Sequence, residues 1–540
     1  MALLPNLPSS ANIKRQIQNQ FGGLAHLRQS SNGTLWDMQN MCSYYAPALA
    51  TRPPRWNFMT VTKPNGMYST ADHLFIVDGT NLYVDGVVVR QVQDNEKTFC
   101  GIGHRVVILP DKIMYNSDGT FTELESTFSA SGLVIGNGTY AGVAAKLNAI
   151  TTTGNTAFPF NVGDAVTISG CSVDYNNLTV VIREKSADGK QIRFYENTFR
   201  LPDNSAEGTT EYTEAGSVTI SRGMPDLDYV CENDNRLWGC KGDTIYACKL
   251  GDPTNWNSFD GLATDSYVVD SGSPGDFTAC VSFLGYPVFF KEDKIYKIYG
   301  SKPSNYEVMA SAVSGVQAGS SKSLAIAGET LHYLSRTGVV SYTGGMPYVI
   351  SDPLGDEILS DAVAGSDGTK LWINMKHGEE GTYTTYVYDT NNKLWHKEDD
   401  VRVIDFAYRK GLYCEDETGQ IYLTGRPEEK PETVVKETTF DSMVEFNDFD
   451  WQIIDSKYPI RSVLRFETFP GAELKVFIQY NSDGEWKQVA AVSGQKTKRQ
   501  WYMPISIRRC EHYRFKIEGK GQWKIYALEQ EFYTGAYTRR

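Results

Sequence analysis

Asn81-Leu82-Tyr83, Asp293-Lys294-Ile295-Tyr296 and Gly419-Gln420-Ile421-Tyr422 share one pattern: a turn residue, an aliphatic residue, then a tyrosine. The pattern recurs at Lys112-Ile113-Met114-Tyr115, Asp243-Thr244-Ile245-Tyr246 and Gly338-Val339-Val340-Ser341-Tyr342. Successive tyrosines of this series lie 32, 131, 50, 46 and 80 residues apart. If the first long gap holds an inserted domain and the second a degenerate copy, the period is about 40–50 residues, which is the blade length of a β-propeller.

Hairpin signals flank these repeats. The run Leu74-Phe75-Ile76-Val77 turns at Asp78-Gly79 and returns as Leu82-Tyr83-Val84, and Asp-Gly between apolar runs is a strong short-range hairpin signal. Counting the degenerate copy at 370–388 gives seven candidate blades. The expected fold class is all-β: a β-propeller of six to eight blades, seven favoured, with an inserted small β-barrel and a C-terminal β-sandwich.

Breaks in the repeat divide the chain. Residues 160–170, 178–182 and 191–195 alternate with period two but do not follow the blade rhythm, and Pro427 to Glu432 is a polar linker. The expected parts are an N-terminal extended arm or strap at 1–65, the first part of the propeller at 66–129, an inserted small β-barrel at 130–222, the second part of the propeller at 223–425, and a linker with the C-terminal β-sandwich at 426–540.

The N-terminal arm has little periodicity and no core of its own. Ser10 to Gln20 predicts a short helix, and the remainder is rich in proline and aromatic residues. Such a segment must lie on another surface. Two alternatives stay open: a strap that closes the propeller ring, or an arm that reaches a neighbouring subunit.

Charge limits the classes of partner. The chain has 52 Lys and Arg against 65 Asp and Glu, a net charge of −13. A main surface that grips nucleic-acid phosphate needs clustered cations, so this balance argues against one. A channel with an acidic or neutral wall, through which DNA slides without sticking, remains compatible. Within the C-terminal part, 494–540 holds eleven Lys and Arg and four Glu, whereas 426–450 holds three Lys and Arg and eight Asp and Glu. These segments are either solvated faces of mixed charge or complementary faces that meet between subunits.

Catalytic and metal signatures are absent from the sequence. There is no Gly-x-Ser-x-Gly elbow, no complete phosphate-binding loop, and no metal-ligand spacing among the seven histidines. The nine cysteines lack Cys-x-x-Cys spacing; Cys231, Cys240 and Cys248 are the only cluster and are expected in a core, in a reducing compartment. The segment Ser117-Asp118-Gly119-Thr120-Phe121 resembles the Asp-box hairpin of sialidase-type propellers, a structural turn. We therefore predict no enzyme, no catalytic, cofactor-binding or metal-binding residue, and no cofactor.

No apolar stretch reaches the roughly 18 residues of a transmembrane helix, and the first 21 residues lack the apolar core of a signal peptide. The sequence predicts no membrane span and synthesis in a cytoplasm.

The N-terminal arm carries the most specific resemblance. Phe21-Gly22-Gly23-Leu24, Trp36-Asp37-Met38-Gln39-Asn40-Met41 and Pro47-Ala48-Leu49-Ala50-Thr51-Arg52-Pro53 resemble the opening of tail and neck proteins of tailed bacteriophages. Gly251-Asp252-Pro253-Thr254-Asn255-Trp256 resembles a propeller turn of such proteins. The layout of strap, propeller, insert and sandwich is similar to the tail nozzle, or packaged-DNA stabilization protein, of short-tailed phages.

This resemblance implies a structural virion protein of the tail or neck, assembled in the cytoplasm of the host bacterium. It implies a homo-oligomeric ring, a hexamer, below the portal and adaptor. The ring would contact these and other tail proteins, enclose the channel, retain packaged double-stranded DNA and pass it at ejection without sequence recognition. The family has no catalytic residues to carry over. The alternative is a carbohydrate-binding or glycosidase-type propeller that acts as a receptor-binding tail component, a reading motivated by the ten tryptophans.

Overall fold

The computed structural model describes residues 13–26, 33–137, 148–195, 198–378, 381–493, 497–505 and 508–534. Residues 1–12 and 27–32 of the expected strap lie outside these ranges. Within them, regular structure is strand apart from four three-residue 3-10 turns, Asp174–Asn176, Pro303–Asn305, Ser321–Ser323 (η3) and Asp352–Leu354. None of these described helices is long and apolar enough to cross a membrane. The predicted all-β class is confirmed.

The chain divides into two compact units, one formed by 1–95 with 316–540 and the other by 96–315. The first unit contains four blade-type antiparallel sheets. Their strands are β6–β9 (Pro64–Ser69, Leu74–Asp78, Asn81–Val84, Val87–Gln91), β31–β34 (Ala325–Ala327, Thr330–Ser335, Gly338–Tyr342, Tyr348–Val349), β35–β38 (Leu359–Ser366, Lys370–His377, Thr382–Asp389, Leu394–Lys397), and β39–β41 (Val403–Tyr408, Leu412–Asp416, Gln420–Thr424) with β5 (Trp56–Thr60) and β42 (Val435–Lys436). The first strands of successive blades pack together, β31 on β35, β35 on β39 and β39 on β6, which is the arrangement around a propeller axis.

The second unit contains three more blades and the insert. The blades are β10–β13 (Thr98–Ile102, Arg105–Leu109, Ile113–Tyr115, Phe121–Glu123), β23–β26 (Tyr229–Asn233, Arg236–Lys241, Thr244–Ala247, Tyr267–Asp270) and β27–β30 (Ala279–Phe283, Tyr286–Lys291, Lys294–Tyr299, Glu307–Ser311). Here β10 packs on β23 and β23 on β27. The described residues of both units thus hold seven blade-type sheets, and the predicted β-propeller is confirmed.

The insert consists of two small sheets around a shared apolar core. One runs β14-β22-β17-β18 (Ser126–Ser131, Ser217–Arg222, Ala165–Ser169, Thr179–Val181), and the other runs β19-β20-β16-β15-β21 (Glu184–Lys185, Gln191–Arg193, Ala149–Thr151, Val134–Gly136, Glu211–Thr213). Phe158, Phe160, Val166 and Ile220 lie in the core between them. The insert therefore has its own hydrophobic centre, as an independently packed module requires.

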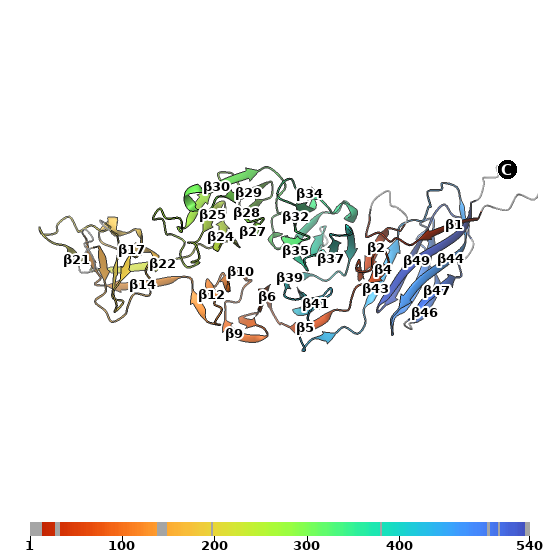
Figure 1. Ribbon diagram of the computed structural model, residues 1–540, viewed down its shortest axis with the longest axis horizontal. Helices are drawn as coiled ribbons and strands as arrows, with labels where there is room; N and C mark the ends of the chain where they lie inside the picture. The colour runs from red at the N-terminus through yellow and green to blue at the C-terminus, as the bar shows by residue number, and fades with distance from the viewer. Residues whose placement is uncertain are drawn as a thin grey trace, which may run out of the picture. The chain divides into compact units, whose positions relative to one another are not determined.

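The C-terminal sandwich belongs to the first unit and uses strands from both ends of the chain (Figure 1). One sheet runs β2-β43-β48-β45-β46 (Leu35–Gln39, Asp441–Phe446, Tyr513–Lys520, Glu473–Tyr480, Lys487–Ser493). The other runs β3-β4-β49-β44-β47 (Met41–Cys42, Leu49–Thr51, Trp523–Thr534, Lys457–Thr468, Thr497–Met503), with β1 (Ile13–Gln18) also paired to β49. Four N-terminal strands thus complete the sandwich, and the fifth, β5, completes a propeller blade.

The expected helix over Ser10 to Gln20 is wrong for its described part. Ile13 and Ile17 have the i, i+4 spacing that favours a helix. The segment instead forms β1, an edge strand in register with β49 from Ile13 opposite Tyr533 to Gln18 opposite Leu528. Pairing with a preformed sheet edge satisfies the backbone groups of a short segment better than an isolated two-turn helix does.

Candidate functional site

The three cysteines that cluster in the sequence are all buried, as expected, but Cys248 lies in a different apolar cluster from Cys231 and Cys240. All nine thiols are buried and free, and Cys231 and Cys240 lie with Cys280 in one apolar cluster. Burial, assisted by the neighbouring thiols of Cys231 and Cys240, raises the pKa of Cys280 well above its usual value, so this thiol stays protonated. In the part of the chain that the structure describes, no group of three or more His, Cys, Asp or Glu side chains is arranged to hold a metal ion.

The segment resembling an Asp box is a self-contained turn. Asp118 Oδ1 accepts hydrogen bonds from Thr120 N at 3.0 Å and from Thr120 Oγ1 at 2.6 Å. The same Asp-x-Thr arrangement occurs in further turns, where the aspartate is Asp252, Asp367 or Asp416. Because each carboxylate bonds to backbone and hydroxyl groups of its own turn, these residues stabilise the hairpin geometry. In the sequence, the spacing Asp-x-Thr identifies more of these turns than the tripeptide Ser-Asp-Gly does.

The strap residues that carry the phage resemblance form a buried joint between the β35–β38 blade and the sandwich. Phe21, Leu24, Met38, Met41 and Leu49 all lie in one continuous hydrophobic cluster. That cluster also includes Trp395 of β38 and Leu464, Phe515 and Trp523 of the sandwich. We call this set the strap joint. It makes blade and sandwich share one core.

A close backbone contact fixes the strap on the blade. Leu24 N donates to Trp395 O at 2.8 Å, and Leu35 N donates to Gly23 O at 3.2 Å. A β-carbon on Gly23 would lie 2.5 Å from Trp395 O and 2.8 Å from Trp395 N. Only glycine therefore permits this approach, although Gly23 has no left-handed φ.

Arg52 connects the strap to the linker of the sandwich. Its side chain is 4% exposed, and its guanidinium donates to both carboxylate oxygens of Glu437, at 2.7 and 3.1 Å. Its Nε donates to Asn40 Oδ1 at 2.6 Å, and its Cζ lies 4.3 Å from the Phe440 ring centroid. Burial alone would raise the pKa of Glu437, but the hydrogen bonds and charge of Arg52 outweigh it and hold this pKa below its usual range. Arg52 and Glu437 therefore form a bidentate ion pair, joined by two parallel N–H···O hydrogen bonds.

A carboxylate pair lies between the closing blade (β39-β40-β41-β5-β42) and the blade that begins with β6. Asp405 on β39 and Glu415 on β40 are direct cross-strand partners. Asp405 Oδ2 accepts from Met67 N at 3.2 Å and lies 3.4 Å from Lys322 Nζ. Glu415 was not among the residues singled out from the sequence. A glutamate within Leu412-Tyr413-Cys414-Glu415 was the available signal, because an apolar run seldom carries an unpaired acid.

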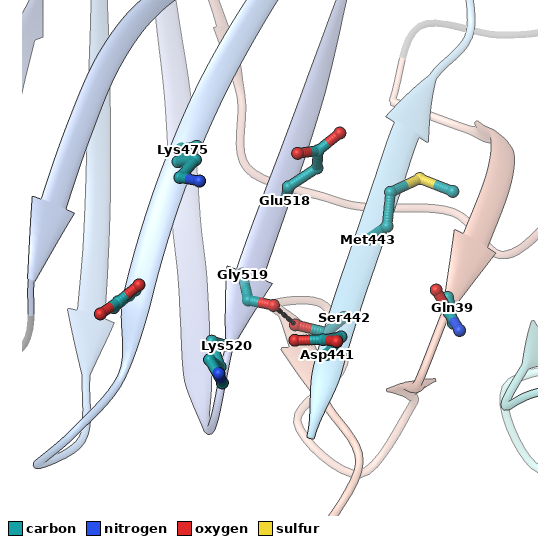
Figure 2. A pocket seen from close by; sticks show the side chains of 9 residues that line it. Gln39, Asp441, Ser442, Met443, Lys475, Glu518, Gly519 and Lys520 are labelled. Atoms are coloured by element: carbon teal, nitrogen blue, oxygen red, sulfur yellow. Dashed lines mark hydrogen bonds between the residues drawn. The ribbon is translucent and has the colours of Figure 1, made fainter. Parts of the chain in front are cut away.

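The outer face of the sandwich holds a groove of about 450 Å³ (Figure 2). One cross-strand row in it runs Met443, Glu518, Lys475, and the next runs Asp441, Lys520, Glu473. Between the rows Ser442 Oγ donates to Gly519 O at 3.2 Å. Acids and lysines alternate across the strands, so the groove is a surface of mixed charge suited to a polar protein segment and not to a single strong anion or cation.

No protein-family model matches the chain, and neither does any curated protein. Among solved structures the similarities are slight. A bifunctional GH43-CE protein of Bacteroides eggerthii is 8% identical with a TM-score of 0.20; the match covers 54% of this chain and 60% of that one, less than two thirds of its length. A structure described as a glycoside hydrolase is 10% identical with a TM-score of 0.18, over 54% of this chain and 81% of that one. Trypanosoma rangeli sialidase is 8% identical with a TM-score of 0.22, and the match covers 97% of this chain and 96% of the sialidase. Similarities at this level identify no activity for this chain.

Proposed function

We propose that this protein is a structural component of a bacteriophage tail or neck. It would form a homo-oligomeric ring, a hexamer, below the portal and adaptor, retain packaged DNA and pass it at ejection. The virion is its proposed location, after assembly in the host bacterial cytoplasm. Its proposed partners are other copies of itself, the portal, adaptor and further tail proteins, and double-stranded DNA passing through without sequence recognition.

The observation that carries this proposal is the strap joint. The three motifs resembling tail and neck proteins all contribute buried residues to it: Phe21 and Leu24 from the first, Met38 and Met41 from the second, and Leu49 from the third. The residues behind the resemblance thus have a mechanical role, locking a propeller blade to a sandwich. A wall that must resist load needs such cross-connection, because domains joined only by a linker move relative to one another.

The first strands of the seven blade-type sheets contain Glu232, Asp361 and Asp405 but no lysine or arginine, so they offer no cation cluster that would bind nucleic-acid phosphate. The last strand of a blade lies at a sheet edge, where a neighbouring subunit could pair with it. The edge strand β9 exposes three successive valines, Val87 at 64%, Val88 at 47% and Val89 at 39%. An open, apolar edge strand is an aggregation hazard unless another surface covers it, and in a ring a second copy would do so.

Val88→Asp is therefore expected to weaken ring assembly at least tenfold, because it places a charge in the apolar contact. The stability of the single chain should change by less than about 0.5 kcal/mol, since the site is exposed. Light scattering after size-exclusion chromatography, with negative-stain imaging, measures assembly. Gln91→Glu is the matched control, as it adds the same charge to a polar position of the same strand. A wild-type chain that stays monomeric at every concentration and with every tail component contradicts the proposed function itself.

A glycosidase-type propeller is the second candidate, and one observation favours it. Asp405 and Glu415 are cross-strand partners, and burial raises the pKa of Glu415 to about 8, as acid-assisted glycoside hydrolysis requires of its general acid. It ranks second because Glu415 has no exposed surface for a sugar to reach. The tryptophans that motivated sugar binding are largely internal: Trp238, Trp256, Trp372, Trp395 and Trp523 are fully buried. Aryl arabinosides, xylosides and sialosides test it: hydrolysis that Asp405→Asn abolishes would favour an enzyme.

A further inference from the structure

Glu415 is an acid enclosed in an apolar interface. Its side chain has 0% exposure, and neither carboxylate oxygen has a hydrogen-bond partner. Its cross-strand partner Ile421 belongs, with Val61, Ile76 and Tyr413, to the apolar cluster between two blades. An ionised carboxylate without a partner in such a place is strongly unfavourable, so something must neutralise it.

The charged groups around Glu415 do not neutralise an ionised carboxylate there. Asp405 on β39 lies opposite Glu415, Asp416 follows it on β40, and Asp78 at the end of β7 adds a third negative charge nearby. Lys322 of η3 is the cation that acts on Glu415, but its Nζ already lies 3.4 Å from Asp405 Oδ2 and from Ile404 O. Because the described residues form no metal-binding group here, a proton is the species left to neutralise Glu415.

We propose that Glu415 is a proton-binding site of the closing blade, which holds the strap strand β5 in place while it is protonated and loosens it when it ionises. The closing blade is the place where this matters. Its first three strands come from residues 403–424, but β5 comes from residues 56–60. Glu415 pairs with Ile421 on β41, and Ile421 pairs with Met59 on β5, so the strap strand is one strand away from the acid.

The direction of the pH effect follows from the raised pKa. Burial first, then the charge of Asp405, raises the pKa of Glu415 from 4.5 to about 8. Between these values the closed blade keeps a proton that the open blade has released. Closure therefore weakens as pH rises from about 4.5 to 8, and is unaffected by this group below about 4.5. If opening exposes Glu415 fully, the opening constant rises on the order of a hundredfold between pH 6 and pH 9.

Hydrogen exchange of the full-length protein tests this proposal. Protection of the β5 amides, 56–60, is measured at pH 6 and pH 9, corrected for intrinsic exchange, and compared with β45 of the sandwich. Wild type should lose protection at β5 on the order of a hundredfold relative to β45. Glu415→Gln, which cannot ionise, should remove this dependence. Glu417→Gln, an exposed acid two residues away, should behave as wild type.

Two results would overturn the proposal. One is corrected β5 protection in the wild type that is equal at the two pH values, a measurement that needs no variant to fold. The other is a Glu415→Gln protein with the same pH dependence as wild type. The proposal is independent of phage assembly, because it concerns a single chain in dilute solution.

Discussion

Arg52→Ala is expected to lower the free energy of unfolding by about 3–5 kcal/mol, the range for removing one partner of a buried ion pair. The substitution leaves Glu437, which also accepts a hydrogen bond from Arg55 N at 3.0 Å, without its guanidinium partner. It also leaves Asn40 Oδ1 without the Arg52 Nε donor and removes the cation above Phe440. Denaturant titration followed by tryptophan fluorescence measures the loss.

The same variant has a predicted pH signature. Glu437 has a lowered pKa in the folded wild type, so its contribution is present above about pH 4.5 and is lost as pH falls through the folded value. The difference between wild type and Arg52→Ala should therefore shrink in acid. Arg508→Ala is the control, because Arg508 pairs with Asp483 on the exposed surface, and its loss should cost less than about 0.5 kcal/mol. If the free energy of unfolding of Arg52→Ala lies within about 1 kcal/mol of the wild-type value, Arg52 does not stabilise the attachment of the strap.

Gly23→Ala is expected to destabilise the protein by about 1–3 kcal/mol through overpacking. The atoms that the new methyl group would meet belong to the backbone of Trp395, which the β37–β38 pairing holds in place, so the strap must move instead. The hydrogen bond from Leu24 N to Trp395 O should open with it.

Thermal unfolding and exchange at the Leu24 amide measure this effect. Gly345→Ala is the matched control, since its β-carbon would have no atom within 4 Å and its φ is not left-handed. We expect the control to stay within about 0.5 kcal/mol of wild type. Equal stability of the two variants would show that the strap has room at Gly23 and that the joint tolerates displacement.

Local patterns predicted the blades because their hairpins are local. Asp85-Gly86, for example, has both residues at positive φ, the turn that matches the twist of adjacent strands, and nothing distant is needed to form it. The pairing of the strap strands could not be predicted from local patterns. Residues 56–60 pair with 420–423, and β1 pairs with β49 near the other end of the chain. The helix expected for Ser10–Gln20 failed because a distant sheet edge competed with local spacing.

Some features of the candidate sites could likewise be predicted from the sequence, and others could not. Buried cysteines and a self-contained Asp-Gly turn followed from residue type and spacing. The acid at Glu415 did not, because its isolation depends on which blade packs against β40 and on Lys322 being engaged by Asp405.

The sequence by itself determined the strand repeat, its turns and the blade period, since each depends on residues only a few positions apart. Tertiary structure alone decided that the strap closes a blade, that Gly23 touches the Trp395 backbone, and that Arg52 meets Glu437. Those contacts join residues hundreds of positions apart, and their energy comes from burial and charge pairing that exist only once the chain has folded.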